Sequence, residues 1–226
     1  MLIASDFRAL TGAVLLILGA LLPVVNPLGD APIFLKMTHG CDEATRAELA
    51  RRIALYSFIL LLGAVLLGSY VLRMFGLSIP VVQVAGGAVV SALGWKLLAS
   101  DSPKPEESAV DPSHAKTIAL GRAVTPLTMP MTIDAGVLSV AVTVGANHAH
   151  TIEHVLIQFV AAVIGAAVIS LSILLTYRYA SKVGALIGQT GMRMVVRLSA
   201  FIMVCIGVGI TWNGAKALLL EIGIPR

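Results

Sequence analysis

Charged residues are almost absent from six long stretches of the chain, and this distribution constrains the fold more than any other feature. Uncharged, mostly apolar runs cover residues 9–29, 53–72, 74–95, 155–177 and 198–215, and the run at 123–152 contains Asp134 as its single charge. A helix crosses a bilayer with about 20 apolar residues. Only 12% of the residues are charged, roughly half the share in a soluble domain. We therefore predict an all-α, polytopic membrane protein with six transmembrane helices.

The 226 residues leave no room for a separate soluble catalytic domain, because six spans take about 120 of them. We expect one integral membrane domain over residues 1–226. It divides into a first three-helix unit (1–98), a Pro-rich cytoplasmic linker (99–116) and a second three-helix unit (117–226). The composition also excludes a disordered chain, a secreted disulfide scaffold and most nucleic-acid-binding domains.

The basic residues predict the orientation of the spans. Of the 16 lysines and arginines, 12 follow the first, third and fifth spans, and 4 lie on the opposite side. Loops rich in lysine and arginine stay in the cytoplasm. We expect a multi-pass protein of the cell inner membrane with both termini outside the cytoplasm. The first run is too long for the apolar core of a signal peptide, so we expect an uncleaved span.

Two proline pairs interrupt the first span of each half. Pro27 and Pro32 stand in the first half, and Pro126 and Pro130 in the second. A proline inside a helix removes a backbone hydrogen bond and clashes with the preceding turn. Each half has an odd number of spans, so a duplicated unit would insert upside down, as in the inverted repeats of many secondary transporters. We predict helix breaks at these four prolines; kinks at the membrane edge are the alternative.

At these residues the chain resembles the MarC family of bacterial and archaeal integral membrane proteins. The segment from Asn26 to Phe34, Asn-Pro-Leu-Gly-Asp-Ala-Pro-Ile-Phe, is similar to the family's Asn-Pro-(Leu/Ile)-Gly-x-x-Pro-(Ile/Val)-Phe. Two weaker matches are Gln83-Val84-Ala85-Gly86-Gly87 and Pro126-Leu127-Thr128-Met129-Pro130. The resemblance implies six spans and, from some relatives, transport of small neutral amino acids. The chain departs from the family pattern at Gln83, where arginine is usual, and at Asp134, near a missing proline.

Two acids intrude on the interrupted segments, and we predict ion coupling at both. A charge at membrane depth costs at least ~2.5–3.5 kcal/mol, so it persists when it faces a cavity, pairs or takes up a proton. For Asp30 the alternative is a helix-capping acid. For Asp134 the alternative is a pair with Arg122 or a similar base.

Polar and small residues beside the prolines are the candidate substrate ligands. Half-helix amino ends favour a carboxylate, and unwound carbonyls favour a cation or an ammonium group. The alternative is that their polar side chains satisfy backbone groups freed by the prolines. The predicted substrate-binding residues are Asn26, Gly29, Asp30, Thr125, Thr128 and Thr132.

No cofactor and no catalytic residue is predicted, because no hydrolase, metalloprotease or paired-aspartate motif is present. No metal site is predicted either; His148, His150 and His154 are interpreted as a polar turn rather than a weak metal site. We expect a secondary transporter of glycine- or alanine-sized neutral amino acids, working by alternating access. Its expected partners are the lipid bilayer, a small-molecule substrate and a coupling proton or sodium ion, with a homo-oligomer allowed. The alternatives are a permease or exporter of another small solute and a non-transporting membrane subunit.

Overall fold

The structure, a computed structural model, describes residues 2–38, 40–99, 121, 123–146 and 152–221. Within these residues the regular structure is entirely helical, as the apolar runs predicted. The elements are α1 (Leu2–Val25), α2 (Pro27–Met37), α3 (Glu43–Met74), α4 (Ile79–Ala99), η1 (Ala123–Thr132), α6 (Ala135–Ala146), α7 (Ile152–Arg178) and α8 (Ala180–Glu221).

Five helical segments of the described chain are long and apolar enough to cross a membrane. They are Phe7–Met37, which joins α1 and α2, then Glu43–Met74, Ile79–Ala99, Val155–Arg178 and Arg193–Glu221. The run at 123–152, predicted as one span, is different: it holds the irregular η1 and the 12-residue helix α6. A 12-residue helix is about 18 Å long and does not cross the hydrocarbon core. The run is interrupted, as the proline pair predicted, because Pro126, Pro130 and Asp134 divide it.

The outer surface of the bundle carries large apolar side chains. Leu16, Leu67, Leu156 and Leu198 are all about half exposed or more. Water would disfavour such a surface, whereas lipid tails match it. Buried side chains such as Leu21, Phe34, Leu49, Ile133 and Ile169 fill the interior. The protein is therefore an integral membrane protein whose surroundings are a lipid bilayer.

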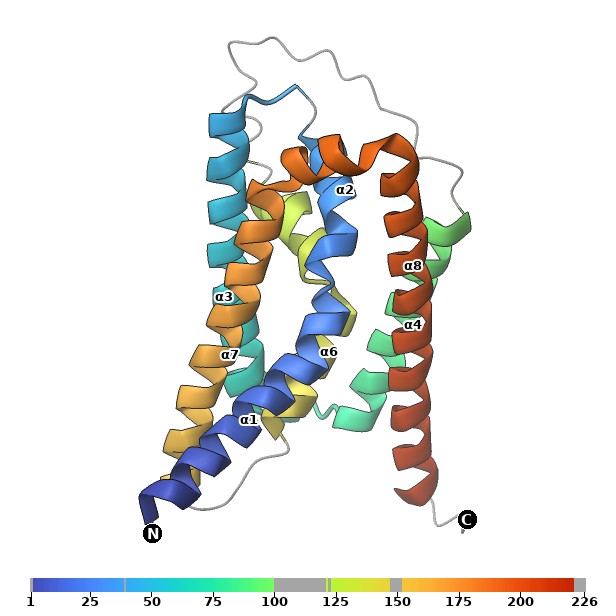
Figure 1. The fold of residues 1–226 in the computed structure, drawn as a ribbon. Helices are drawn as coiled ribbons and strands as arrows, with labels where there is room; N and C mark the ends of the chain where they lie inside the picture. The colour runs from blue at the N-terminus through green and yellow to red at the C-terminus, as the bar shows by residue number, and fades with distance from the viewer. Residues whose placement is uncertain (1, 39, 100–120, 122, 147–151, 222–226) are drawn as a thin grey trace.

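The long helices form two groups, with α2 and α6 between them (Figure 1). Helix α3 packs against α7, and α1 packs against α7. Helix α4 packs along α8. The short helices α2 and α6 bridge the two groups, because α2 contacts both α7 and α8 and α6 contacts both α3 and α4.

Glycines allow the backbones of α4 and α8 to touch. A Cβ added at Gly87 would lie 2.6 Å from the Gly207 carbonyl oxygen, and one at Gly207 would lie 2.6 Å from the Ser91 amide nitrogen. Gly94 and Gly214 have similar backbone neighbours on the partner helix. Small residues support close helix packing in membranes. Helices α4 and α8 are therefore a closely packed pair.

Three helix ends that carry a basic residue lie at one end of the bundle. Helices α2, α4 and α7 end there, and Lys36, Lys96 and Arg178 stand in their last turns. The start of α1 and the end of α8 lie at the opposite end, on opposite sides of the bundle (Figure 1). Helix α3 also ends at that opposite end, with Arg73 in its last turn, so the orientation in the membrane stays a prediction from the loop count. The linker at 100–116 and Arg122 lie outside the described residues.

Candidate functional site

The first interruption falls at Asn26, between α1 and α2. Asn26 adopts the left-handed conformation (φ 45°, ψ 57°), which asparagine tolerates better than most residues. Its side-chain oxygen accepts a hydrogen bond from the Gly29 amide at 3.3 Å, so Asn26 caps the new helix. Pro27 is the first residue of α2, where a missing N–H costs nothing. Pro32 lies inside α2, which continues past it to Met37, so the predicted break is at Pro27 alone.

The second interruption is built from both predicted prolines. Thr125 (φ −128°, ψ 123°) and Met129 (φ −118°, ψ 124°) are extended inside η1. Each stands directly before a proline, Pro126 or Pro130, and the proline ring excludes the helical conformation from the residue before it. The chain resumes a regular helix only at Ala135.

Threonine hydroxyls satisfy carbonyl groups that the second interruption frees. Thr128 Oγ1 donates to the Ala123 carbonyl at 2.6 Å, and Thr132 Oγ1 donates to the Leu127 carbonyl at 2.8 Å. Both side chains are buried. These bonds follow the backbone alternative stated above for the threonines. Thr125 is exposed and lies at the outer part of η1.

Asp134 caps the first turn of α6, as Asn26 caps the first turn of α2. Its Oδ1 accepts a hydrogen bond from the Val137 amide at 2.8 Å, three residues along, which is the geometry of an N-cap. The capping role predicted as the alternative for Asp30 thus belongs to Asp134, and Asp30 stands one residue beyond the capped Gly29 amide. The residues that cap the two helix starts, Asn26 and Asp134, thus correspond to each other.

The two helix starts meet inside the bundle. Asp30 and Asp134, 7% and 6% exposed, are close enough for their carboxyl groups to interact electrostatically. Helices α2 and α6 then run toward opposite ends of the bundle (Figure 1). Each helix start carries a partial positive charge and unpaired amides. Among the described residues, the buried Asn26 Nδ2 has no hydrogen-bond partner. This meeting point, formed by Asn26, Gly29, Asp30, Thr132 and Asp134, is the candidate site, and below we call it the central polar site.

Tyr177 borders the central polar site and is not among the residues predicted for it. It is fully buried on α7, and its hydroxyl lies 2.9 Å from Thr132 Oγ1. Its ring stacks on Phe34 of α2, with centroids 4.5 Å apart and planes at 11°. It also interacts electrostatically with Asp30. The sequence held a signal, a tyrosine near the end of an otherwise apolar span, but belts of tyrosine at membrane interfaces give the same signal.

Close contacts also fix the surroundings of the central polar site. A Cβ added at Gly29 would lie 2.5 Å from Ser199 Cβ on α8, so α2 approaches α8 there as closely as a glycine permits. On the other side Ser139 of α6 donates to the Val82 carbonyl of α4 at 3.0 Å. Gln83, the residue that departs from the family pattern, donates to Thr143 Oγ1 at 3.2 Å. Helix α2 therefore packs closely against α8, and α6 is hydrogen-bonded to α4.

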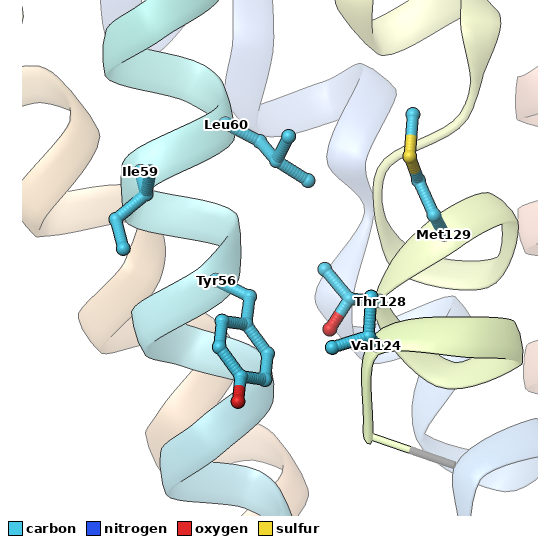
Figure 2. A pocket seen from close by; sticks show the side chains of 6 residues that line it. All are labelled: Tyr56, Ile59, Leu60, Val124, Thr128 and Met129. Atoms are coloured by element: carbon cyan, nitrogen blue, oxygen red, sulfur yellow. The ribbon is translucent and has the colours of Figure 1, made fainter. Parts of the chain in front are cut away.

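A separate groove of about 190 Å³ lies between α3 and η1. Figure 2 shows Tyr56, Ile59 and Leu60 of α3 on one wall, and Val124, Thr128 and Met129 of η1 on the other. Its surface is apolar, which does not suit a charged or zwitterionic molecule. Thr128 thus lies on this groove rather than at the central polar site.

Of the histidine cluster, His148 and His150 lie outside the described residues. Cys205 is exposed on α8, and Cys41 is partly buried before α3. Neither bears on the central polar site.

Comparison with known proteins gives one consistent result. Residues 12–219 match the family model described as "MarC family integral membrane protein". A Bacillus subtilis protein named "UPF0056 membrane protein YvbG" is 30% identical over 200 residues, covering 88% of this chain and 92% of its own. "UPF0056 inner membrane protein MarC" of Citrobacter koseri is 29% identical over 214 residues, with the same coverage. No solved structure matches.

Proposed function

The chain belongs to the MarC family of integral membrane proteins, and from this premise we propose that it is a secondary transporter of small neutral amino acids. The proposal includes no catalytic activity. The proposed substrate class, that of glycine and alanine, comes from the family resemblance. The protein would sit in the inner membrane, like the relatives called inner membrane proteins, with its basic end in the cytoplasm and both termini outside.

One observation carries the proposal: two half-helices begin beside each other at membrane depth, each at a polar cap and with acids at the meeting point. Discontinuous helices of this kind form the substrate and ion sites of many transporters. An amino acid is a zwitterion, so its site needs both signs of charge. The amide groups of the helix starts and Asn26 Nδ2 suit a carboxylate. Asp30 and Asp134 suit an ammonium group, a proton or a sodium ion.

The contact pattern supports an inverted repeat of two three-helix halves. Exchanging the halves pairs α1 with η1, α2 with α6, α3 with α7 and α4 with α8. Most packings then have a counterpart: α2 on α8 matches α6 on α4, and α1 on α7 matches η1 on α3. The exception is the smaller contact of α7 with α8, which has no counterpart of similar size between α3 and α4. The largest packings, α4 on α8 and α3 on α7, map onto themselves. Such an arrangement suits alternating access, because a state open to one side has an equivalent state open to the other.

The same pattern indicates what would move. The α4–α8 pair is joined by backbone contacts at its glycines, so it is expected to move as one body. Helices α1, α3 and α7 form the other body. The half-helices α2 and α6 lie between the two, and movement of the pair would open α2 from α8 or α6 from α4.

Uptake into liposomes that contain the purified protein tests the proposal. We expect saturable uptake of labelled glycine or alanine under a proton or sodium gradient. Asp30→Asn is expected to lower it by about tenfold or more, because a hydrogen bond to a charged group contributes ~1.5–3 kcal/mol. Glu43→Gln, on an exposed acid in the first turn of α3, is the matched control and should transport normally. Absence of saturable amino acid flux in the unmodified protein would refute the proposal, and a competition panel would show whether another small solute is carried.

A further inference from the structure

The hydroxyl groups of Tyr177 and Thr132 form a directed chain of hydrogen bonds. The Leu127 carbonyl can only accept, so the single hydrogen of the Thr132 hydroxyl is given to it, at 2.8 Å. Thr132 Oγ1 therefore accepts from Tyr177, whose oxygen is 2.9 Å away. The single hydrogen of Tyr177 is then committed to Thr132. Toward its remaining neighbours the Tyr177 oxygen can act only as an acceptor.

Asp30 stands one helical turn before Phe34 on the same face of α2, and the Tyr177 ring stacks on Phe34, so Asp30 lies beside Tyr177 and interacts with it electrostatically. A bare carboxylate also only accepts, so no hydrogen bond can join it to the Tyr177 oxygen while Tyr177 donates to Thr132. A carboxyl group that carries a proton, or holds a cation or an ammonium group, presents a positive partner instead. The Tyr177 hydroxyl can thus donate its hydrogen bond to Thr132 or to a bare Asp30 carboxylate, but not to both.

Tyr177 contacts both interrupted segments, so it can link the state of Asp30 in the first half to the second interruption. Its ring stacks on Phe34, which fixes it against the half-helix that carries Asp30. Its hydroxyl reaches Thr132, the last residue of η1 and two residues before the Asp134 cap. Tyr177 itself belongs to α7, so one side chain touches both interrupted segments from a continuous span.

We propose that Tyr177 is a positioning residue that couples occupancy of Asp30 to the conformation of the second helix interruption. With Asp30 occupied, Tyr177 bonds Thr132 and holds the end of η1. With Asp30 bare, the hydroxyl turns to the carboxylate and releases Thr132. The titratable groups recorded at this place are Asp30 of α2, Asp134 at the start of α6 and Tyr177 of α7. The inference rests on the proposed transport function and adds the residue that links the ion to the movement.

Tyr177→Phe is the direct test, because it removes the hydroxyl and keeps the stacked ring. Two rates are compared in liposomes: accumulation of glycine or alanine driven by a proton or sodium gradient, and exchange of the same amino acid at equal concentrations without a gradient. We expect driven accumulation to fall by about tenfold, and exchange to stay within about twofold. A purely structural role would lower both rates together.

Two further variants complete the test. Thr132→Val removes the other hydroxyl with little change of shape. Because Thr132 belongs to the central polar site, both rates are expected to fall, and the readout is their ratio: we expect driven accumulation relative to exchange to fall by about tenfold, and this ratio carries the test if Tyr177→Phe does not fold. The double variant should show the same ratio as Thr132→Val alone, because Thr132→Val already removes the bond to Tyr177 together with the bond to the Leu127 carbonyl. Tyr70→Phe is the control for loss of a tyrosine hydroxyl, since Tyr70 is 68% exposed near the end of α3.

The outcomes separate this inference from the proposed function. Unmodified protein without flux refutes both. Unmodified protein that transports, together with Tyr177→Phe protein that keeps its driven accumulation, refutes the coupling role alone. Equal loss of driven accumulation and exchange in both variants also refutes it.

Discussion

The contact between α4 and α8 makes a prediction that two neighbouring glycines of α8 can test. Gly207 and Gly209 are two residues apart on the same helix. A Cβ at Gly207 would lie 2.5 Å from Ser91 Oγ and 2.6 Å from the Ser91 amide nitrogen, whereas a Cβ at Gly209 would have no neighbour within 4 Å. Alanine at Gly207 therefore forces the two backbones apart, and alanine at Gly209 does not.

The size of the effect follows from that geometry. Ordinary contact begins at 3.4 Å, so the helices must separate by about 0.8 Å at this point, and overpacking of this kind costs ~1–3 kcal/mol. Both substitutions gain up to ~1 kcal/mol from the helix preference of alanine over glycine. The gain cancels between the variants. We expect Gly207→Ala to be less stable than Gly209→Ala by ~1–3 kcal/mol.

Reversible unfolding of the protein in mixed detergent micelles measures this difference. Helix content is followed by circular dichroism as the fraction of denaturing detergent rises, and the free energy of unfolding is compared between variants. Gly209→Ala is expected to equal or exceed the unmodified protein. Two variants that agree within about 0.5 kcal/mol, the usual limit for surface changes, would refute the close approach of α4 and α8.

Five other changes test four separate features. Pro27→Ala removes the residue that begins α2 and is expected to lower transport more than stability; normal flux would show that the interruption is only a kink. Asp134→Ala removes the cap of α6 and should cost ~1 kcal/mol of unfolding free energy, whereas Asp134→Asn keeps an acceptor for the Val137 amide and should lose transport with little loss of stability. Gly29→Val places side-chain atoms against Ser199 and should abolish flux, as measured in liposomes. A periplasmic reporter fused after residue 226 should be active and a cytoplasmic reporter silent, because the basic loops predict an external carboxyl end.

The fold was largely predictable because the bilayer limits the choices. Apolar runs of about 20 residues have one common solution, a helix that satisfies its own backbone. The exception is the run at 123–152, because the hydropathy of a segment does not report whether its backbone can form a continuous helix. Pro126 and Pro130 each force the preceding residue to be extended. Two such residues four positions apart prevent a continuous helix, which is why the proline pair predicted this interruption.

The site was predictable in its residue types and less so in its arrangement. Asp30 and Asp134 were identified because charges are rare at membrane depth, and the structure brings them together. The prolines mark the two interruptions, whereas the helix starts depend on which side chain caps the next free amides, Asn26 for α2 and Asp134 for α6. Thr128 faces an apolar groove, and Tyr177 reaches the site from another helix. Neither placement can be derived from spacing along the chain, because both depend on how separate helices pack.

The position of the two acids explains how their charge is stabilised inside the bundle and why that charge still favours binding of a proton or a cation. A charge at membrane depth costs at least ~2.5–3.5 kcal/mol on insertion scales. A helix start offsets up to ~2 kcal/mol of that for an acid in its first turn, and Asp134 also accepts the Val137 amide. The helix starts therefore offset most of the cost of each charge and leave ~1 kcal/mol or more uncompensated. Two carboxyl groups that also interact with each other raise the uncompensated part further. A proton, a cation or an ammonium group that enters the site removes it, so ligand binding at this point changes the stability of the helix arrangement that surrounds it.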